Sequence, residues 1–215
     1  MPVWNRSQYH IDSGPKKILV GFGDIINFFE WERRNSLSRE EFRRFIKGFK
    51  SQLTHLQSKG YFLKHLGDGA MFIKEMKGFD DQKRIVDFLC DSNFLYETIM
   101  DLIKSVSYPR PKGFRIRIAL GEAEKTTEWV PWGKCVNIDY TGYIVDMAFK
   151  LLMADKNEAP LLCHESVKDA LSFKTIKKRG IIFNKWPRPK LTNVVIDSYD
   201  LDALWKFGCQ KPHKK

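Results

Sequence analysis

The sequence lacks any apolar run long enough to cross a bilayer. Of its 215 residues, 43% are hydrophobic and 29% are charged, whereas a membrane-spanning helix needs about 18 or more consecutive apolar residues. The N-terminal segment MPVWNRSQYHIDSG contains no apolar stretch of the kind that a secretory signal peptide requires. We therefore expect a soluble, cytoplasmic protein without a membrane partner.

Paired cysteines and clustered histidines are also missing. The four cysteines are far apart in the chain, none forms a Cys-x-x-Cys pair, and the five histidines are isolated. This pattern is typical of reduced cytosolic thiols, and it argues against a disulfide framework or a centre that holds a metal through Cys or His. The cysteines are Cys90, Cys135, Cys163 and Cys209.

Acidic residues are too few to balance the basic ones, since 26 Asp and Glu face 37 Lys and Arg, for a net charge of +11. Basic residues gather in KTIKKRG (174–180), in NKWPRPK (184–190) and in KPHKK at the C-terminus. Basic side chains around Trp186 are one pattern of nucleic-acid binding. We favour a charged surface with a general attraction to polyanions as their explanation, and nucleoside triphosphates are polyanions too. Charge alone does not choose between these partners, although we do not expect nucleic acid to be one.

No internal repeat or low-complexity linker interrupts the alternation of strands and helices. The apolar patterns predict one α/β (α+β) domain with a mixed sheet flanked by helices. We expect an N-terminal extension (1–15), the domain (16–203) and a basic tail (204–215). Predicted strands are 16–23, 61–66, 70–76, 114–124, 159–166 (running into a short helix), 180–183 and 193–201, and predicted helices are 38–60, 80–107 and 141–154.

The helix predicted at 38–60 is the clearest element. Ser38 and Glu41 have the spacing of a capping box, and Gly60 suits a C-terminal cap. Its apolar residues recur at helical spacing and should form one buried face. They are Phe42, Phe45, Ile46, Phe49, Leu53 and Leu56.

Two aspartates stand out by their context. Asp24 follows an apolar strand in LVGFGDIINFF, and Asp68 occupies a Gly-Asp-Gly turn between two strands in KHLGDGAMF. If that hairpin pairs beside the first strand, the two carboxylates face each other and can hold hard divalent ions together with substrate phosphates. Each aspartate alone also has a plain explanation, as a turn residue or as a helix cap.

The order of the motifs resembles the class III nucleotidyl cyclase catalytic domain. The sequence shows VGFGDIINFF, LKHLGDGAMF, FRIRIALGEAE, DYTGYIVDMAFKLLMAD and PLLCHES in that order, over roughly residues 16 to 200. The resemblance implies a ferredoxin-like mixed sheet flanked by helices. It also implies a lyase that converts a nucleoside triphosphate to its 3′,5′-cyclic monophosphate and pyrophosphate.

The resemblance assigns metal and phosphate contacts to the first two motifs. Asp24 and Asp68 match the metal-binding aspartates of the family, and Ile25 matches the residue that offers a backbone carbonyl. The implied cofactors are two divalent metal ions, Mn²⁺ or Mg²⁺. Backbone N–H groups at a helix N-terminus would cradle the triphosphate, and these belong to Ile26, Asn27, Phe28 and Phe29.

Contacts to the base, the ribose and the α-phosphate fall on other segments. Lys64 and Asp139 match the two base-recognising residues. Asp146 stands where the family has a ribose-orienting asparagine, and Lys150 stands where it has the transition-state arginine. Both are departures, because lysine lacks the bidentate guanidinium and aspartate removes a donor. Either they are catalytic, or they form a charged helix face while another cation, such as Lys134 or a C-terminal basic residue, takes the role.

In the family, the metal ligands and the base contacts of one site come from different protomers, so the resemblance implies a homodimer with composite active sites. Lysine with aspartate is the family's adenine pattern, whereas glutamate with cysteine selects guanine. A lysine donor and an aspartate acceptor nevertheless complement adenine, uracil and cytosine edges alike. Bulky neighbours at Tyr61, Phe62, Tyr140 and Tyr143 favour a smaller base, unless these aromatics only pack in the core.

With little beyond the cyclase domain, the sequence resembles the stand-alone pyrimidine cyclases of bacterial anti-phage systems. We expect UTP as the substrate and cyclic UMP as a messenger for a downstream effector, with ATP or CTP as alternative substrates. The G-G-D/E-E-F turn of diguanylate cyclases is absent. A nucleic-acid-binding module of degenerate cyclase ancestry is the non-enzymatic alternative, but it leaves the presence of both Asp24 and Asp68 unexplained.

Overall fold

The computed structural model describes residues 8–11, 14–34, 39–78, 81–107, 109–129, 135–154, 160–185 and 191–196. Lys134, Trp186 and the basic tail 204–215 lie outside these residues. The strands are β1 (Gln8–Ile11), β2 (Lys16–Ile26), β3 (Phe62–Leu66), β4 (Gly69–Glu75), β5 (Gly113–Trp129), β6 (Cys135–Thr141), β7 (Leu161–His164), β8 (Ile181–Lys185) and β9 (Leu191–Ile196). The helices are α1 (Phe28–Arg34), α2 (Arg39–Ser58), α3 (Asp81–Lys104), α4 (Tyr143–Ala154), α5 (Glu165–Asp169) and α6 (Phe173–Lys178).

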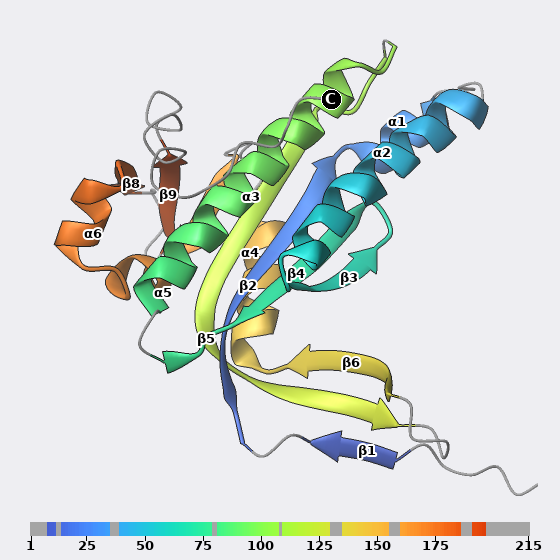
Figure 1. Ribbon diagram of the computed structural model, residues 1–215. Coiled ribbons are helices and arrows are strands. Elements are labelled where there is room, and N and C mark those ends of the chain that lie inside the picture. Colours follow the sequence, from blue (N-terminus) through green and yellow to red (C-terminus); the bar gives the residue numbers. More distant parts are fainter. Residues whose placement is uncertain are drawn as a thin grey trace, which may run out of the picture.

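A mixed sheet runs through the described residues in the order β3-β4-β2-β5-β7-β9-β8 (Figure 1). β2 lies between β4 and β5 and pairs antiparallel with both, whereas β7 is the parallel neighbour of β5. Asp24 near the end of β2 is therefore opposite Gly69 of β4 on one side and Arg115 of β5 on the other. The mixed α/β architecture predicted from the sequence is confirmed.

The long strand β5 belongs both to the main sheet and to a smaller arm, which consists of β1, β6 and the far half of β5. Its residues 113–123 pair with β2, and its far half pairs with β1 and β6 on either side. In Figure 1 the arm extends below the main sheet. The sequence pattern predicted only 114–124 of β5 and neither β1 nor β6. Short strands such as these are stabilised by their neighbour more than by their own apolar pattern.

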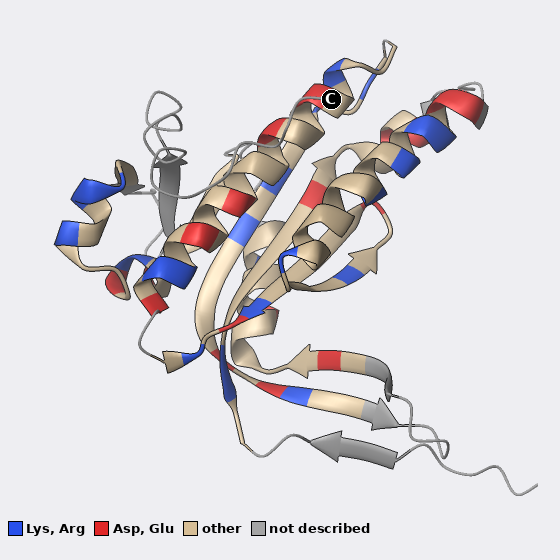
Figure 2. Ribbon diagram, in the orientation of Figure 1, with Lys and Arg blue, Asp and Glu red and all other residues tan. Residues whose placement is uncertain are grey.

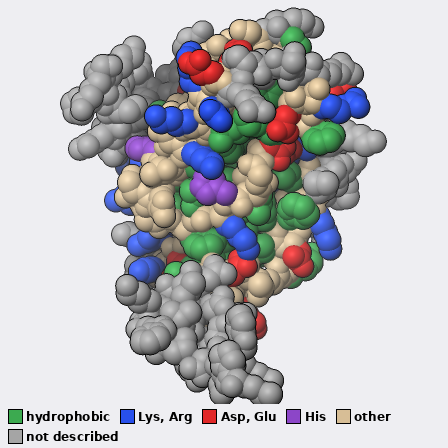
Figure 3. Space-filling view, turned by 90° about the vertical axis from the view of Figure 1, so that its right-hand side faces the viewer, with side chains coloured by type: hydrophobic (Ala, Val, Ile, Leu, Met, Phe, Trp, Pro, Cys, Tyr) green, Lys and Arg blue, Asp and Glu red, His purple; other side chains and the backbone are tan. Residues whose placement is uncertain are grey.

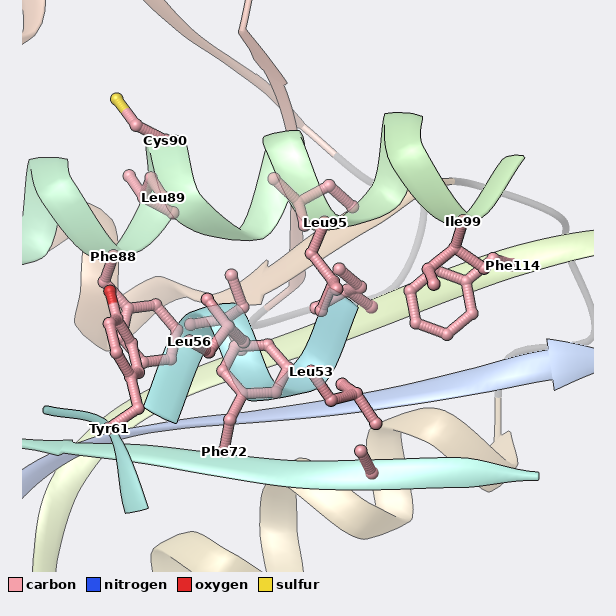
Figure 4. Close-up of a cluster of buried hydrophobic side chains, with 14 of the residues drawn as sticks. Leu53, Leu56, Tyr61, Phe72, Phe88, Leu89, Cys90, Leu95, Ile99 and Phe114 are labelled. Carbon is pink, nitrogen blue, oxygen red and sulfur yellow. The ribbon is translucent and has the colours of Figure 1, made fainter. Parts of the chain in front are cut away.

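Helices cover both faces of the sheet, with α2 and α3 on one face and α4 on the other (Figure 1). Residues of β2 alternate between the two sides, so that Leu19 belongs to the core beneath α2 and α3, while Ile18 and Val20 belong to the core beneath α4. Figure 4 shows the larger core, where Phe72 of the sheet and Phe88 of α3 lie with ring centroids 5.3 Å apart.

Helix α2 forms as predicted. Four of its apolar residues are fully buried, and Phe42 and Ile46 pack against the same core at its edge. Gly60 has φ 78°, which suits a residue that ends a helix. Ser38 lies outside the described residues, and Glu41 accepts a hydrogen bond from the backbone N–H of Ser107 at 2.7 Å. The buried four are Phe45, Phe49, Leu53 and Leu56.

Among the remaining helices, α3 and α4 match their predictions to within a few residues. α1 begins at Phe28, within the residues 26–29 where the resemblance implied a helix N-terminus, whereas α6 was not predicted. α1 and α6 are short, seven and six residues, so neither shows a clear helical period. No helix in the described part of the chain is long and apolar enough to cross a membrane.

Candidate active site

Asp24 and Asp68 lie close together, as the sequence predicted. The antiparallel pairing of β2 with β4 sets Asp24 opposite Gly69, and Asp68 is the residue directly before Gly69. Partial burial raises the pKa of Asp68 above its ordinary value, and the negative charges of Asp24 and, more weakly, Glu32 of α1 add to this rise. A carboxylate that is repelled by a second one is a favourable position for a cation.

Glycine is needed on each side of Asp68 for a different physical reason. Gly67 has φ 75°, a left-handed conformation that side chains with a Cβ rarely adopt. Gly69 allows close contact between strands, because a Cβ placed there would lie 2.6 Å from the carbonyl oxygen of Gly23. The turn can therefore hold Asp68 against β2 only while residue 69 has no side chain.

Arg115 of β5 is the first site residue that sequence reasoning missed. Its Nε and Nη2 donate to one oxygen of Asp24 at 3.2 and 2.9 Å, and both side chains are largely buried. Figure 2 shows acidic and basic positions side by side on the upper parts of β2 and β5. The alternation of FRIRIALGEAE does indicate that Arg115 and Arg117 share a face of the strand. Its closeness to Asp24 depends on the register between β5 and β2.

Arg117 continues this face and is fully buried. It lies opposite Phe22 on β2 and Leu162 on β7, and its Nη1 donates to the carbonyl of Ile116 at 2.9 Å. A fully buried guanidinium is rare unless it is hydrogen-bonded. Arg117 therefore adds a second positive charge on the same face of β5, two residues from Arg115.

The donors around Asp24 and Asp68 suit a hard divalent cation. Both aspartates offer carboxylate oxygens, the ligands that Mg²⁺ and Mn²⁺ prefer. Within the described residues, no three His, Cys, Asp or Glu side chains gather into a complete metal-binding group. The described side chains thus supply two carboxylates, while the remaining ligands would come from the backbone, substrate or water.

The expected phosphate cradle follows Asp24 directly. Ile25 is buried, so only its backbone can face a ligand. Asn27 has φ 61°, and its carbonyl accepts a hydrogen bond from the backbone N–H of Trp31 at 2.9 Å, which starts α1. Asparagine tolerates this left-handed conformation better than most residues. Phe28 is buried and Phe29 is 73% exposed, and the role of Ile26 to Phe29 as a cradle stays a prediction.

The two residues predicted to read the base contact each other. Lys64 of β3 and Asp139 of β6 form an ion pair with an Nζ to Oδ2 distance of 2.6 Å. Their side chains are 45% and 31% exposed, so a ligand can reach both. One donor and one acceptor therefore stand side by side, 75 residues apart in the sequence.

The structure separates the four aromatics that were expected to narrow the base pocket. Tyr61 packs on Phe72 and Phe88 in the larger core and donates to Asp91 at 2.7 Å. Tyr140 packs on Phe62 and donates to Glu75 at 2.6 Å. Burial of Tyr61 and Tyr140 shows that core packing explains these two.

Phe62 is half-buried against Tyr140, which also ties it to the core. Tyr143 differs from the other three, because 77% of it is exposed. The argument that bulky groups favour a small base therefore depends mainly on Tyr143.

Asp146 and Lys150 lie on the exposed side of α4. The buried side of this helix, formed by Ile144, Ala148 and Leu152, packs on the sheet. Among the described residues, no hydrogen bond or ion pair links Asp146 or Lys150 to Asp24 or Asp68 of the same chain.

Comparison with known proteins identifies the fold. No family model and no curated protein sequence matches the chain. Among solved structures, the adenylyl cyclase CyaB from P. aeruginosa matches with a TM-score of 0.64 at 19% identity, covering 91% of this chain and 99% of that one. The guanylyl cyclase Cya2 matches with a TM-score of 0.64 at 12% identity, covering 86% and 95%. The guanylate cyclase domain of RhGC from Catenaria anguillulae, determined in complex with GTP, matches with a TM-score of 0.54 at 16% identity, covering 83% and 94%.

The chain therefore has the fold of the catalytic domain of adenylyl and guanylyl cyclases, over nearly its whole described length. This confirms the fold that the order of the sequence motifs implied. At identities below 20%, the likeness concerns the fold, and the assignment of an activity depends on the residues of the site.

Proposed function

We propose that the protein is a nucleotidyl cyclase that converts a nucleoside triphosphate to its 3′,5′-cyclic monophosphate and pyrophosphate. The observation that carries the proposal is the position of Asp24 and Asp68, which lie close together where β2 ends and β4 begins in a cyclase fold. The cyclase activities of the structural neighbours support it. A nucleic-acid-binding module would gain nothing from two mutually repelling carboxylates.

Asp24, Asp68 and the carbonyl of Ile25 would hold two divalent ions, Mn²⁺ or Mg²⁺, which supply activation of the ribose 3′-hydroxyl and neutralisation of the triphosphate. Lys150 places a positive charge where the α-phosphate reacts, and Asp146 accepts hydrogen bonds from the ribose. Lys64 donates to the base and Asp139 accepts from it. Most of the rate enhancement then comes from positioning and charge stabilisation.

Arg115 gives the metal site a competitor. Its guanidinium bonds to Asp24 in the structure, so a divalent ion that takes the same carboxylate oxygen must displace it. The two Arg115 donors that leave Asp24 can then bind the triphosphate, for which a guanidinium is a good partner. The Arg115 guanidinium and the metal ion would therefore bind the Asp24 oxygen in turn and not at the same time.

We infer that the active protein is a homodimer with composite sites. Asp146 and Lys150 face away from the chain's own sheet, which suits a substrate held by the aspartates of a second copy. Figure 3 shows hydrophobic side chains at the surface on the side of the molecule where β3 forms the sheet edge. Exposed apolar side chains such as Leu66 (39%) and Phe149 (45%) support a protein partner.

For the base we propose UTP, and hence cyclic UMP as a second messenger in anti-phage defence that a separate effector detects. The Lys64–Asp139 pair complements uracil O4 and N3–H. It complements adenine and cytosine as well, so ATP and CTP are the alternatives. The large exposed ring of Tyr143, four residues after Asp139 in the chain, favours the smaller base.

The test is an assay of the purified protein with Mn²⁺ and each of the four nucleoside triphosphates in turn. We expect a cyclic nucleotide and pyrophosphate, with cyclic UMP formed fastest, and a loss of at least about a hundredfold in kcat for Asp68→Asn. Product from ATP alone would overturn the choice of UTP. No product from any triphosphate, together with salt-sensitive RNA or DNA binding, would overturn the cyclase and favour the nucleic-acid-binding module.

A further inference from the structure

Tyr143 is a large aromatic side chain left at the surface. It is the first residue of α4 and is 77% exposed, far more than any other aromatic residue of this helix or of β6 for which the structure gives an exposure. The exposed tyrosine buries little apolar area in the isolated chain, so it contributes little to folding. Such a ring on a helix that carries candidate site residues is a natural ligand contact.

Tyr143 shares one face of α4 with Asp146 and Lys150. The three residues follow at i, i+3 and i+7, and at about 100° per residue they fall within roughly 60° of each other. The buried residues Ile144 and Ala148 lie on the opposite face. The outward face of α4 thus presents an aromatic ring, a carboxylate and an ammonium in order along its axis.

Asp139, which pairs with Lys64, comes directly before the Tyr143 end of this face in the chain. Asp139 is four residues before Tyr143, and the chain turns between them at Gly142, which has φ 137°. Along the helix, Tyr143 and Lys150 are separated by about 10 Å at 1.5 Å per residue. The order of groups is therefore a donor–acceptor pair, a ring, a carboxylate and a cation.

From this order, we propose that Tyr143 stacks on the nucleobase of the triphosphate whose ribose and phosphate lie along α4. Lys64 and Asp139 then contact the edge of the base while Tyr143 covers its face, Asp146 meets the ribose, and Lys150 meets the α-phosphate. The proposal rests on the cyclase function proposed above. It adds a base-contacting residue, and it explains why an exposed aromatic precedes two charged residues of the reaction.

Stacking on a ring face depends on the ring of Tyr143 and not on its hydroxyl. Tyr143→Ala should therefore raise KM for UTP by about tenfold, with kcat changed by less than about twofold, since ground state and transition state lose the same contact. Tyr143→Phe should retain the wild-type KM to within about twofold. Phe173→Ala is the matched control, because Phe173 is 80% exposed on α6, away from α4 and β6.

Binding measurements separate this inference from the activity. 3′-Deoxy-UTP lacks the attacking hydroxyl and cannot cyclise, so its affinity in the presence of Mn²⁺ reports binding alone, by calorimetry. Ribose 5-triphosphate lacks the base. We expect Tyr143→Ala to weaken binding of 3′-deoxy-UTP by about tenfold, and to leave binding of ribose 5-triphosphate unchanged.

Equal affinities of wild type and Tyr143→Ala for 3′-deoxy-UTP would overturn the stacking role, even if the wild type cyclises UTP. Equal weakening for both ligands would also overturn it, and with a loss of dimer in analytical ultracentrifugation it would make Tyr143 a subunit contact. A wild-type protein that binds 3′-deoxy-UTP with the predicted Tyr143 dependence but forms no cyclic product would overturn the cyclase alone. Failure to bind either ligand would overturn both.

Discussion

Asp68 occupies an unfavourable environment for a single carboxylate. Burial and the nearby charge of Asp24 raise its pKa above the ordinary value of 3.8, so the folded protein holds the proton more tightly than the unfolded chain does. The contribution of Asp68 to stability is therefore largest in acid, and it is lost as the pH rises from about 3.8 through the raised pKa of the folded state. At neutral pH the charged side chain is a cost that a bound cation would offset.

Asp68→Asn should thus stabilise the metal-free protein at pH 7 while it abolishes metal-dependent turnover. We expect Tm to rise by about 2 °C at pH 7 and to rise less as the pH is lowered, because Asp68 then takes up a proton and loses its charge. Thermal unfolding between about pH 4 and pH 8 in the presence of a chelator measures this. Asp101→Asn is the control, because Asp101 is 77% exposed in a surface pair with Lys104. A lower Tm for Asp68→Asn at pH 7 would contradict the account.

Single residues also show where sequence reasoning reached its limit. Tyr61 and Tyr140 looked like members of a base pocket, because they are close in sequence to Lys64 and Asp139. Their hydroxyls instead donate to Asp91 and Glu75 in or near the core. Adjacent residues of a strand point to opposite faces, so closeness in sequence to Asp139 placed Tyr140 on the wrong side of β6.

Among the elements, the β3–β4 hairpin is the one that sets the geometry of the site. Its turn brings Asp68 to β2, and Gly69 makes this approach possible by leaving space for the carbonyl oxygen of Gly23, which would be 2.6 Å from a Cβ. Both atoms in this contact would be held by the sheet, so neither can move away at small cost. The packing of the hairpin against β2 and the position of Asp68 in the candidate metal site therefore both depend on Gly69.

Gly69→Ala should separate β4 from β2 at the end where Asp24 and Asp68 meet. We expect a loss of about 1–3 kcal/mol in the free energy of unfolding and a fall of at least about tenfold in turnover. Denaturant unfolding and the UTP assay measure the two effects. Gly67→Asn is the matched variant, because position 67 needs a left-handed φ but has open space around it, and it should retain most of the activity. Equal activity of both variants would show that the close approach does not position Asp68.

At the scale of the whole molecule, the two groups of candidate residues belong to different elements of one chain. Asp24 and Asp68 are at the end of β2 and β4, whereas Asp146 and Lys150 are on the outward face of α4. A dimer in which each site takes one group from each protomer unites them, and it explains why one protomer alone is not expected to turn over substrate.

Mixing two inactive variants tests this arrangement. Asp68→Asn removes a metal ligand and Lys150→Ala removes the cation, so a heterodimer of the two contains one intact site and one doubly altered site. Random mixing makes about half of the dimers heterodimers, so we expect about a quarter of the wild-type activity. Asp24→Asn mixed with Asp68→Asn is the control, since both sites of that heterodimer remain altered. No recovery in the first mixture would contradict composite sites.

The sequence by itself determined the local parts of this protein. The apolar spacing of α2 and α4, the turn around Asp68 and the strand that ends near Asp24 are all set by residues within a few positions of one another, through helical and strand periodicity and the backbone freedom of glycine. The order of these parts was enough to indicate the cyclase fold. It also placed Lys64, Asp139, Asp146 and Lys150 among the candidate residues.

Only the tertiary structure decided which side chains meet. Arg115 bonds to Asp24 across 91 positions and Lys64 bonds to Asp139 across 75, because the register of β2 with β5 and the fold of the β5–β6 arm bring them together. Strand register depends on pairing between distant segments, which no local pattern specifies. For the same reason, the burial of Tyr140 and the exposure of Tyr143, three residues apart in the chain, became visible only in the folded molecule.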